Sequence, residues 1–321
     1  MRGSELLSRI GLFVLVALVV GALFTVPMLN GQSVAEEPGM NISSHDTENI
    51  LAEAPAETGS VSVDAGAESK HVVIDAGHGN DIDRATLAPV LESLAAAGHE
   101  VSFYRGSPMG SINATLRQAD AFVVISPGTT YSAADRAGLE AFVDAGGRLL
   151  LAGEPTSQTS GTFASLLLGS GAQMGSSAPL AGLAAPFGIA YSDGYVYDLE
   201  RYDLNYRNVY ASPSGAAFPG DANVTVHEAV PVRGGTPILE TVDTAKLSSG
   251  REAESYPVAT RNGDVVAVGD ASLFDTEWVQ RNDNEAFVGA VMEFLVTGEK
   301  SPGAPAQPQP SGEFGTPTRM P

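Results

Sequence analysis

The stretch His71-Val-Val-Ile-Asp-Ala-Gly-His-Gly-Asn-Asp81 decides how this chain is interpreted. Its apolar run, Val72 to Ile74, predicts a buried strand that ends at Asp75 in a loop with two glycines and a histidine. In open α/β sheets, ligands bind in the crevice beyond the carboxyl ends of the strands. The stretch therefore predicts either a zinc hydrolase or an α/β domain that has the crevice without catalytic machinery.

Strand and helix signals alternate after this strand. Apolar strands are predicted at 100–104, 121–126, 148–152 and 264–269, and amphipathic helices at 83–97, 132–145 and 284–296. Such alternation is typical of a parallel sheet covered on both faces. We expect an α/β domain over 70–298 with a three-layer parallel sheet. Residues 155–262 are expected to form an irregular insertion, with short strand-like runs at 224–227, 238–242 and 257–261.

The N-terminus predicts a membrane anchor. Residues 10–29 carry no charge and are long enough to form a transmembrane helix across the hydrocarbon core. Arg2 and Arg9 precede this segment, so residues 1–9 are expected in the cytoplasm and the domain outside it. The alternative is a cleaved signal peptide, with Ser33-Val34-Ala35 as the cleavage site and a secreted domain.

Two further segments are too polar to form a core. Residues 30–69 are predicted to be a disordered acidic linker, and residues 299–321 a disordered proline-rich tail. Glycosylation sequons begin at Asn41, Asn113 and Asn223, which makes them candidate modification sites on an external protein.

The composition is acidic and free of cysteine. The net charge is −21, and only three of the 17 basic residues are lysines. This balance disfavours nucleic acid as a partner, because phosphate binding needs Lys and Arg. It fits a halophilic protein, in which high salt screens the self-repulsion; the alternative is an ordinary acidic surface protein. The lack of cysteine excludes disulfides, thiolate zinc sites and thiol nucleophiles.

Enzyme motifs are incomplete in this chain. Ile74-Asp-Ala-Gly-His-Gly79 resembles the opening of zinc-dependent N-acetylmuramoyl-L-alanine amidases, in which the matching histidine, here His78, binds the metal. Catalytic zinc needs three protein ligands, and the sequence supplies no second histidine where that family has one. An amidotransferase-like nucleophile elbow is also missing, because Ser126-Pro127-Gly128 lacks the first glycine and the amide N–H after the serine.

Polar residues at the predicted strand ends form a candidate ligand-binding crevice. They are Asp75, His78, Asn80, Ser126, Glu154, Asp270 and Ser272. The alternative is that these side chains cap loops and helix N-termini. A second candidate surface comprises three tyrosines from a tyrosine-rich stretch, Tyr195, Tyr197 and Tyr206, which suit a sugar or protein contact. The alternative for these is a small aromatic core under a loop.

Four stretches in order carry a resemblance to the domain-of-unknown-function 4350 family. They are 74–80; 141–151; 186–189 followed by 193–197 and 205–208; and 268–274 leading to 282–284. The chain is similar also to the auxiliary extracytoplasmic component of gliding-motility-type ABC transporters. The resemblance implies a flavodoxin- or class I amidotransferase-like fold and a membrane-anchored, non-catalytic role.

We therefore expect a binding or accessory subunit of a membrane complex, with no catalytic residues, metal or cofactor. Its partners are expected to be the membrane, through residues 10–29, and other proteins, with a glycan as a further candidate ligand. The alternatives are a metal-dependent hydrolase that uses His78 and the strand-end carboxylates, and a carbohydrate-binding module.

Overall fold

The computed structural model describes residues 59–306, except residues 65, 67, 81, 83, 107–110, 155–177, 216–217 and 219–221. A sheet of nine strands crosses the domain, and its first five strands are parallel. In spatial order these are β2 (Glu100–Tyr104), β1 (His71–Asp75), β3 (Ala121–Ile125), β4 (Arg148–Ala152) and β13 (Val265–Val268). β3 and β13 are buried at every residue, as expected for parallel strands with both faces covered.

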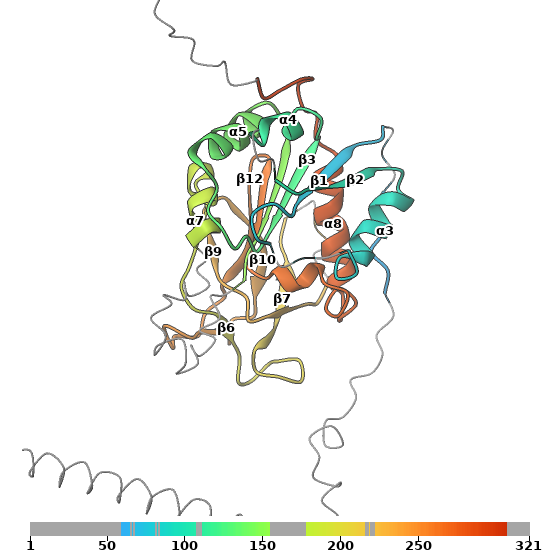
Figure 1. Ribbon diagram of the computed structural model, residues 1–321. Coiled ribbons are helices and arrows are strands. Elements are labelled where there is room, and N and C mark those ends of the chain that lie inside the picture. The colour runs from blue at the N-terminus through green and yellow to red at the C-terminus, as the bar shows by residue number, and fades with distance from the viewer. Residues whose placement is uncertain are drawn as a thin grey trace, which may run out of the picture. The chain divides into compact units, whose positions relative to one another are not determined.

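Helices cover both faces of this parallel half (Figure 1). α3 (Ala88–Ala96) and α8 (Asn284–Val296) pack on one face, and α4 (Asn113–Leu116), α5 (Ala133–Asp144) and α7 (Ala178–Ala184) on the other. Side chains alternate between the faces: Val72 and Ile74 join the α3–α8 core, and Val73 joins the α5 core. Ser132 is the N-cap of α5, and its hydroxyl accepts a hydrogen bond from the Asp135 amide at 3.1 Å.

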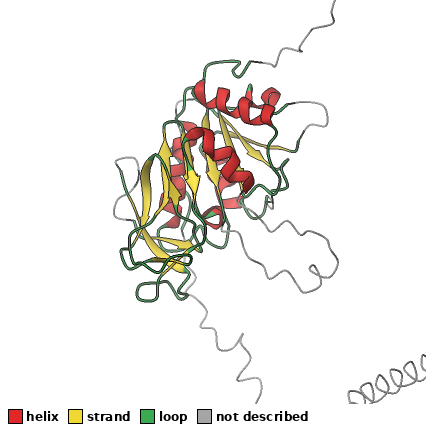
Figure 2. Cartoon of the chain, turned by 90° about the vertical axis from the view of Figure 1, so that its left-hand side faces the viewer, coloured by secondary structure: helices red, strands yellow, loops and turns green. Residues whose placement is uncertain are grey.

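The other four strands continue the same sheet in antiparallel pairing. They are β12 (Pro257–Asn262), β10 (Thr236–Thr241), β7 (Asn208–Pro213) and β8 (Val224–His227). Two small ribbons and two 3₁₀ helices complete the domain: β5 (Ala190–Tyr191) with β9 (Val232–Arg233), β6 (Val196–Tyr197) with β11 (Lys246–Leu247), η2 (Ala185–Phe187) and η3 (Ala271–Phe274). Figure 2 shows the strand-rich part continuing beyond the helix-covered part.

The predicted flavodoxin- or amidotransferase-like parallel sheet is therefore wrong. The sheet is mixed, and its antiparallel strands all come from residues 208–262, within the segment predicted to be irregular. Bulges between Pro237 and Glu240 break the alternation of β10. The apolar pattern of these strands is completed by pairing with residues far away in the sequence, and a local pattern cannot report that pairing.

The free side of β8 is closed by an asparagine. Asn284 is fully buried, its Oδ1 accepts a hydrogen bond from the Thr225 amide at 2.7 Å, and its Nδ2 donates to the Thr225 carbonyl at 3.0 Å. This side-chain amide takes the place of a neighbouring strand at Thr225, while Asp283 bonds the backbone of Asn223 and Asp270 accepts the His227 amide on either side of it. Together these contacts end the sheet at β8.

The N-terminal side of the domain runs beside α8. The Gly59 carbonyl accepts a hydrogen bond from Gln280 at 3.0 Å, and the Asp64 amide donates to Glu293 at 3.3 Å. Residues 59–64, at the end of the segment predicted to be a linker, thus lie along this helix. Within the described ranges, no helix is long and apolar enough to cross a membrane. The predicted transmembrane helix, residues 10–29, lies outside them.

Candidate functional site

The polar residues predicted at the strand ends lie along one edge of the sheet. β1, β3, β4 and β13 are parallel and in register, so their carboxyl ends meet at this edge. β1 and β13 are three strand spacings apart, which is about 14 Å at about 4.8 Å per spacing. The predicted crevice therefore divides into two clusters, one after β1 and one after β13.

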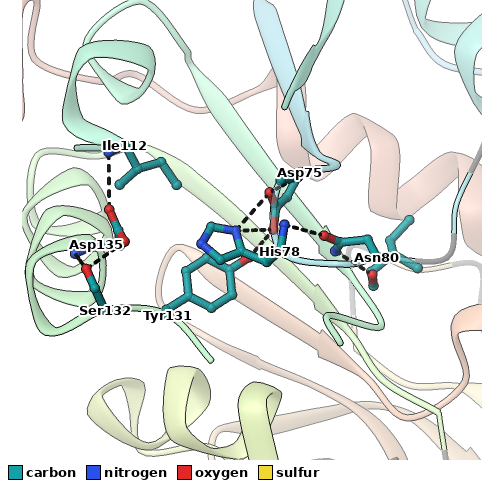
Figure 3. A network of polar contacts seen from close by, with 9 residues as sticks. Asp75, His78, Asn80, Ile112, Tyr131, Ser132 and Asp135 are labelled. Carbon is teal, nitrogen blue, oxygen red and sulfur yellow. Dashed lines mark hydrogen bonds and ion pairs between the residues drawn. The ribbon is translucent and has the colours of Figure 1, made fainter. Parts of the chain in front are cut away.

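The first cluster is built on Asp75, the last residue of β1, which is fully buried (Figure 3). Its carboxylate accepts hydrogen bonds from His78 Nδ1 at 2.9 Å, from the Gly77 amide at 3.0 Å and from the Tyr131 hydroxyl. Burial, followed by the nearby Asp75 carboxylate, raises the pKa of the Tyr131 phenol, so the phenol stays protonated and donates. Three donors thus satisfy a carboxylate that has no contact with water.

His78 is held in place from several sides. Its ring stacks on Tyr131 with centroids 3.7 Å apart, and its side chain is only 13 % exposed. Its carbonyl accepts hydrogen bonds from the amides of Gly128 and Thr129, and a side chain at Gly128 would lie 2.7 Å from the Gly79 carbonyl oxygen. Nδ1 is engaged by Asp75, and no described residue bonds Nε2.

Asn80 and Ser126 connect this cluster to β3. Asn80 donates to the Ile125 carbonyl at 2.8 Å and accepts from the His78 amide at 3.1 Å, so it shapes the loop. Ser126 has φ of +41°, a region costly for any residue with a side chain, and its buried hydroxyl has no hydrogen-bond partner among the described residues. Its amide donates to the Ala152 carbonyl at 2.9 Å.

The second cluster is built on Asp270, which is 1 % exposed. Its carboxylate accepts hydrogen bonds from the Ser272 amide at 2.9 Å, the Ser272 hydroxyl at 2.6 Å and the His227 amide at 2.6 Å. It thereby caps η3 and ties that turn to the end of β8. Burial raises the pKa of Asp270 to about 6, although these hydrogen bonds oppose the shift.

Glu154 lies beside this cluster, two residues after β4. Desolvation of its carboxyl group, followed by the charges of Asp270, Glu228 and Asp275, raises the pKa of Glu154 to about 7. The carboxyl groups at the ends of β4 and β13 thus both have raised pKa values. Within the described ranges, no group of three or more His, Asp or Glu side chains could hold a metal ion.

The three predicted tyrosines do come together. Tyr197 packs edge-on against Tyr195 at 6.5 Å and against Tyr206 at 6.3 Å between centroids. The Arg207 guanidinium lies over the Tyr195 and Tyr206 rings, donates to the Tyr206 hydroxyl at 3.0 Å and pairs with Glu228. Arg207 precedes β7 and Glu228 follows β8 at the same edge as Asp270, and the Val196 amide of β6 donates to the Ala229 carbonyl, so the aromatic cluster borders the second cluster.

The sequence did not single out Tyr131, Tyr104 or Glu228. Tyr131 directly precedes the α5 cap at Ser132, and the Asp135 carboxylate at the start of α5 also accepts the Ile112 amide at 3.2 Å (Figure 3). An aromatic residue next to a helix cap was the available signal for Tyr131. Glu228 has φ of +47° at the end of β8 and gives no signal in the sequence.

A separate hollow of about 380 Å³ lies at the opposite edge of the sheet. Ser214, Thr236 and Arg261 line it, and these residues lie at the ends of β7, β10 and β12 that are next to the start of β13. None of the predicted site residues lies there. The carboxyl edge of the sheet is the better candidate site, because interacting polar and aromatic side chains gather there.

The described sequons differ in access. Asn113 is 7 % exposed and its amide donates to the Ala306 carbonyl at 3.3 Å, so folding covers this acceptor. Asn223 is exposed at the start of β8. Asn41 lies outside the described residues.

Comparison with known proteins places this geometry in a family. A family model described as domain of unknown function 4350 (DUF4350) matches residues 86–291, which is more than half of the chain. A solved structure described as "mmIFT52 N-terminal domain" is 12 % identical and has a TM-score of 0.55, with 72 % of this chain and 99 % of that chain covered. At this identity the likeness shows the fold alone. No curated protein matches the sequence. The predicted family resemblance is confirmed, and the chain belongs to the DUF4350 family.

Proposed function

We propose that this protein is a non-catalytic binding or accessory subunit of an ABC-transporter-like membrane complex, with its domain outside the cytoplasm. The membrane attachment rests on the uncharged segment 10–29 and the arginines that precede it. We also propose that the protein works in high salt, because its net charge is −21.

The observation that carries the non-catalytic role is how the strand-end carboxylates are used. Asp75 and Asp270 each accept three hydrogen bonds from the protein itself. A general base or a nucleophile must reach its substrate, whereas Asp75 and Asp270 are 0 % and 1 % exposed. These two carboxylates hold loops in place, which suits a rigid recognition surface.

The test uses the full chain, purified from membranes in mild detergent and high salt. We expect defined subunits to co-purify in fixed ratio, and peptidoglycan fragments, esters and glycosides to remain uncleaved. Hydrolysis of any of these substrates that His78→Ala abolishes, while the fold is retained, would overturn the proposal. A Thr129→Ala variant is the matched control, because Thr129 is exposed beside the His78 loop and only its amide contacts His78.

A metal-dependent hydrolase is the second candidate, and the Asp75–His78 pair favours it. Metal-binding histidines commonly direct one ring nitrogen to a carboxylate, and His78 does so through Nδ1. Elemental analysis of the purified chain decides between the two. Stoichiometric zinc that is lost in His78→Ala would support the hydrolase, and an equal trace in both proteins would exclude this site.

A glycan-binding role is the third candidate, supported by the aromatic cluster with Arg207 beside it. Glycan-array binding should fall at least tenfold when Tyr195→Ala and Tyr197→Ala are combined. Binding that persists in this double variant would rule the cluster out.

A further inference from the structure

One loop of the domain gathers the exposed large apolar side chains. In the described part of the chain, the exposed large hydrophobic residues are Leu199 (60 %), Tyr202 (43 %), Leu204 (64 %) and Tyr206 (40 %). All four lie in Leu199–Tyr206, between β6 and β7, which we call the apolar loop. Single exposed apolar residues are ordinary, but four within eight residues form a patch that signals an interaction surface.

The apolar loop is held in one conformation. Asp198 is fully buried and accepts the amides of Glu200 at 2.7 Å and Arg201 at 3.0 Å, and it also accepts the Thr244 hydroxyl. Farther along, the Asp203 carbonyl accepts from the Asn208 side chain at 2.8 Å. The patch therefore exists before any partner arrives, and binding needs little further ordering.

Leu204 bears two costs at once. It is the most exposed of the four residues, and its φ of +60° lies in the left-handed region that disfavours a branched side chain. An asparagine or glycine would suit this turn better on both counts. A leucine retained at the tip of a rigid loop points to a contact made by its side chain.

The apolar loop carries little net charge, although the whole chain is strongly acidic. Asp203 pairs with Arg281 at 2.7 Å, and Arg201 lies 3.9 Å from the Asp243 carboxylate, which leaves about one net negative charge, on the exposed Glu200. A lipid surface would repel this loop only weakly. Leucines suit the acyl boundary of a bilayer, and tyrosines suit the headgroup level.

The position of the apolar loop relative to the chain start favours a membrane as the occupant. Gln280 bonds the Gly59 carbonyl, and the next residue, Arg281, bonds Asp203 of the loop. The loop and the first described residue therefore lie at the same end of the domain. β6 lies at the lower end in Figure 1, and the chain after α8 leaves at the upper end. Residues 30–58, predicted from the sequence to be a linker, separate Gly59 from the predicted membrane segment, and a linker of that length spans about 30 Å on average.

We infer that the apolar loop is a second membrane contact, which inserts Leu199 and Leu204 into the lipid interface while Tyr202 and Tyr206 lie at the headgroups. The inference rests on the proposed membrane attachment through residues 10–29. A short tether holds the loop at high effective concentration near the bilayer, so a weak contact becomes persistent. The contact fixes which face of the domain is turned away from the membrane.

The experiment labels two exposed glutamates, one at a time, in the full chain. The chain has no cysteine, so Glu200→Cys in the apolar loop and Glu299→Cys beyond α8 each give a single site for an environment-sensitive NBD fluorophore. α8 has 13 residues and separates the two ends of the domain by about 20 Å. Both proteins are reconstituted into phosphatidylcholine vesicles with and without doxyl-labelled acyl chains.

We expect doxyl lipids to quench the label at residue 200 at least threefold more than the label at residue 299, with a blue-shifted emission at residue 200. Adding Leu199→Ser and Leu204→Ser should abolish the difference, while the chain still floats with the vesicles. These two side chains are exposed, and an unchanged thermal midpoint verifies the fold.

Equal quenching at both sites in floating protein would overturn the loop contact and leave the membrane attachment standing. A blue shift at residue 200 without lipid quenching would assign the patch to another protein or a second copy, and would also overturn it. A chain that fails to float with the vesicles would instead refute the proposed membrane attachment.

Discussion

Asp75 and Asp270 occupy equivalent places at the ends of two parallel strands, yet their surroundings differ. Asp75 is bonded mainly by side chains, an imidazole and a phenol that stack on each other. Asp270 is bonded by two backbone amides and one hydroxyl, and acidic groups lie nearby. Both carboxylates are buried because they lie at the ends of parallel strands. Their hydrogen-bond donors differ, so Asp75 orients the His78 and Tyr131 side chains, whereas Asp270 stabilises the η3 turn.

The largest expected effect is the loss of stability caused by removing the Asp75 carboxylate. Asp75→Ala leaves the Tyr131 hydroxyl, the Gly77 amide and His78 Nδ1 without an acceptor in a buried site, so the free energy of unfolding should fall by about 3–5 kcal/mol. Denaturant unfolding monitored by circular dichroism measures this loss. Tyr131→Phe removes one donor and should cost about 1 kcal/mol. A smaller loss for Asp75→Ala than for Tyr131→Phe would break the comparison.

The second largest effect is the pH dependence of stability that Asp270 is expected to cause. The pKa of folded Asp270 is raised to about 6 from an unfolded value of 3.8, so the folded state binds more protons between these values. Stability is therefore gained as the pH falls through about 6 and lost as it rises through that value. Between about pH 8 and about pH 5 the gain should be about 1 kcal/mol, and Asp270→Asn should remove it.

His99 and His227 act in the opposite direction in this range. Burial lowers the pKa of both imidazoles, so each loses stability as the pH falls below 6.5. The informative quantity is accordingly the difference between wild type and Asp270→Asn across the pH series. A difference that stays constant with pH would show that Asp270 does not titrate in this way.

A third expected effect concerns the residue between the two clusters. Ser126→Gly relieves the positive φ and removes a buried hydroxyl without a partner among the described residues, so stability should rise by about 1 kcal/mol. Ser126→Ala keeps the backbone cost and should gain less. If instead both variants destabilise the domain, the Ser126 hydroxyl has a stabilising hydrogen-bond partner, and this prediction is wrong.

The smallest expected effect lies in the apolar loop. Leu204→Asn places a residue that tolerates left-handed backbone where an exposed leucine stands, and stability should rise by about 0.5 kcal/mol. Thermal unfolding in high salt measures the gain. Leu199→Asn has no positive φ to relieve and serves as the control, with no gain expected.

The sequence predicted the edge positions of Asp75, Ser126 and Asp270 because each follows an apolar run directly, and a run of that kind reports a buried strand from local pattern alone. It could not predict what these residues bind. Tyr131 lies 56 positions from Asp75, and His227 lies 43 positions from Asp270. Such contacts depend on tertiary packing.

The same limit explains the wrong sheet type. β8, β10 and β12 coincide with the strand-like runs expected at 224–227, 238–242 and 257–261, so these strands were detectable locally. Their antiparallel pairing into the main sheet was not, because it joins segments that are distant in the sequence. The site therefore combines a predictable framework with partners that only the fold brings together.

The side-chain amide of Asn284 has a consequence for the behaviour of many copies of this chain. A sheet with a bare last strand can recruit the same strand from another molecule and grow into a fibre. Here one buried asparagine occupies the bonding groups of Thr225 on that flank. Asp283 bonds Asn223 and Asp270 bonds His227 on the same flank, so crowded molecules are kept from fusing their sheets at β8 by these contacts as well as by the strong negative charge.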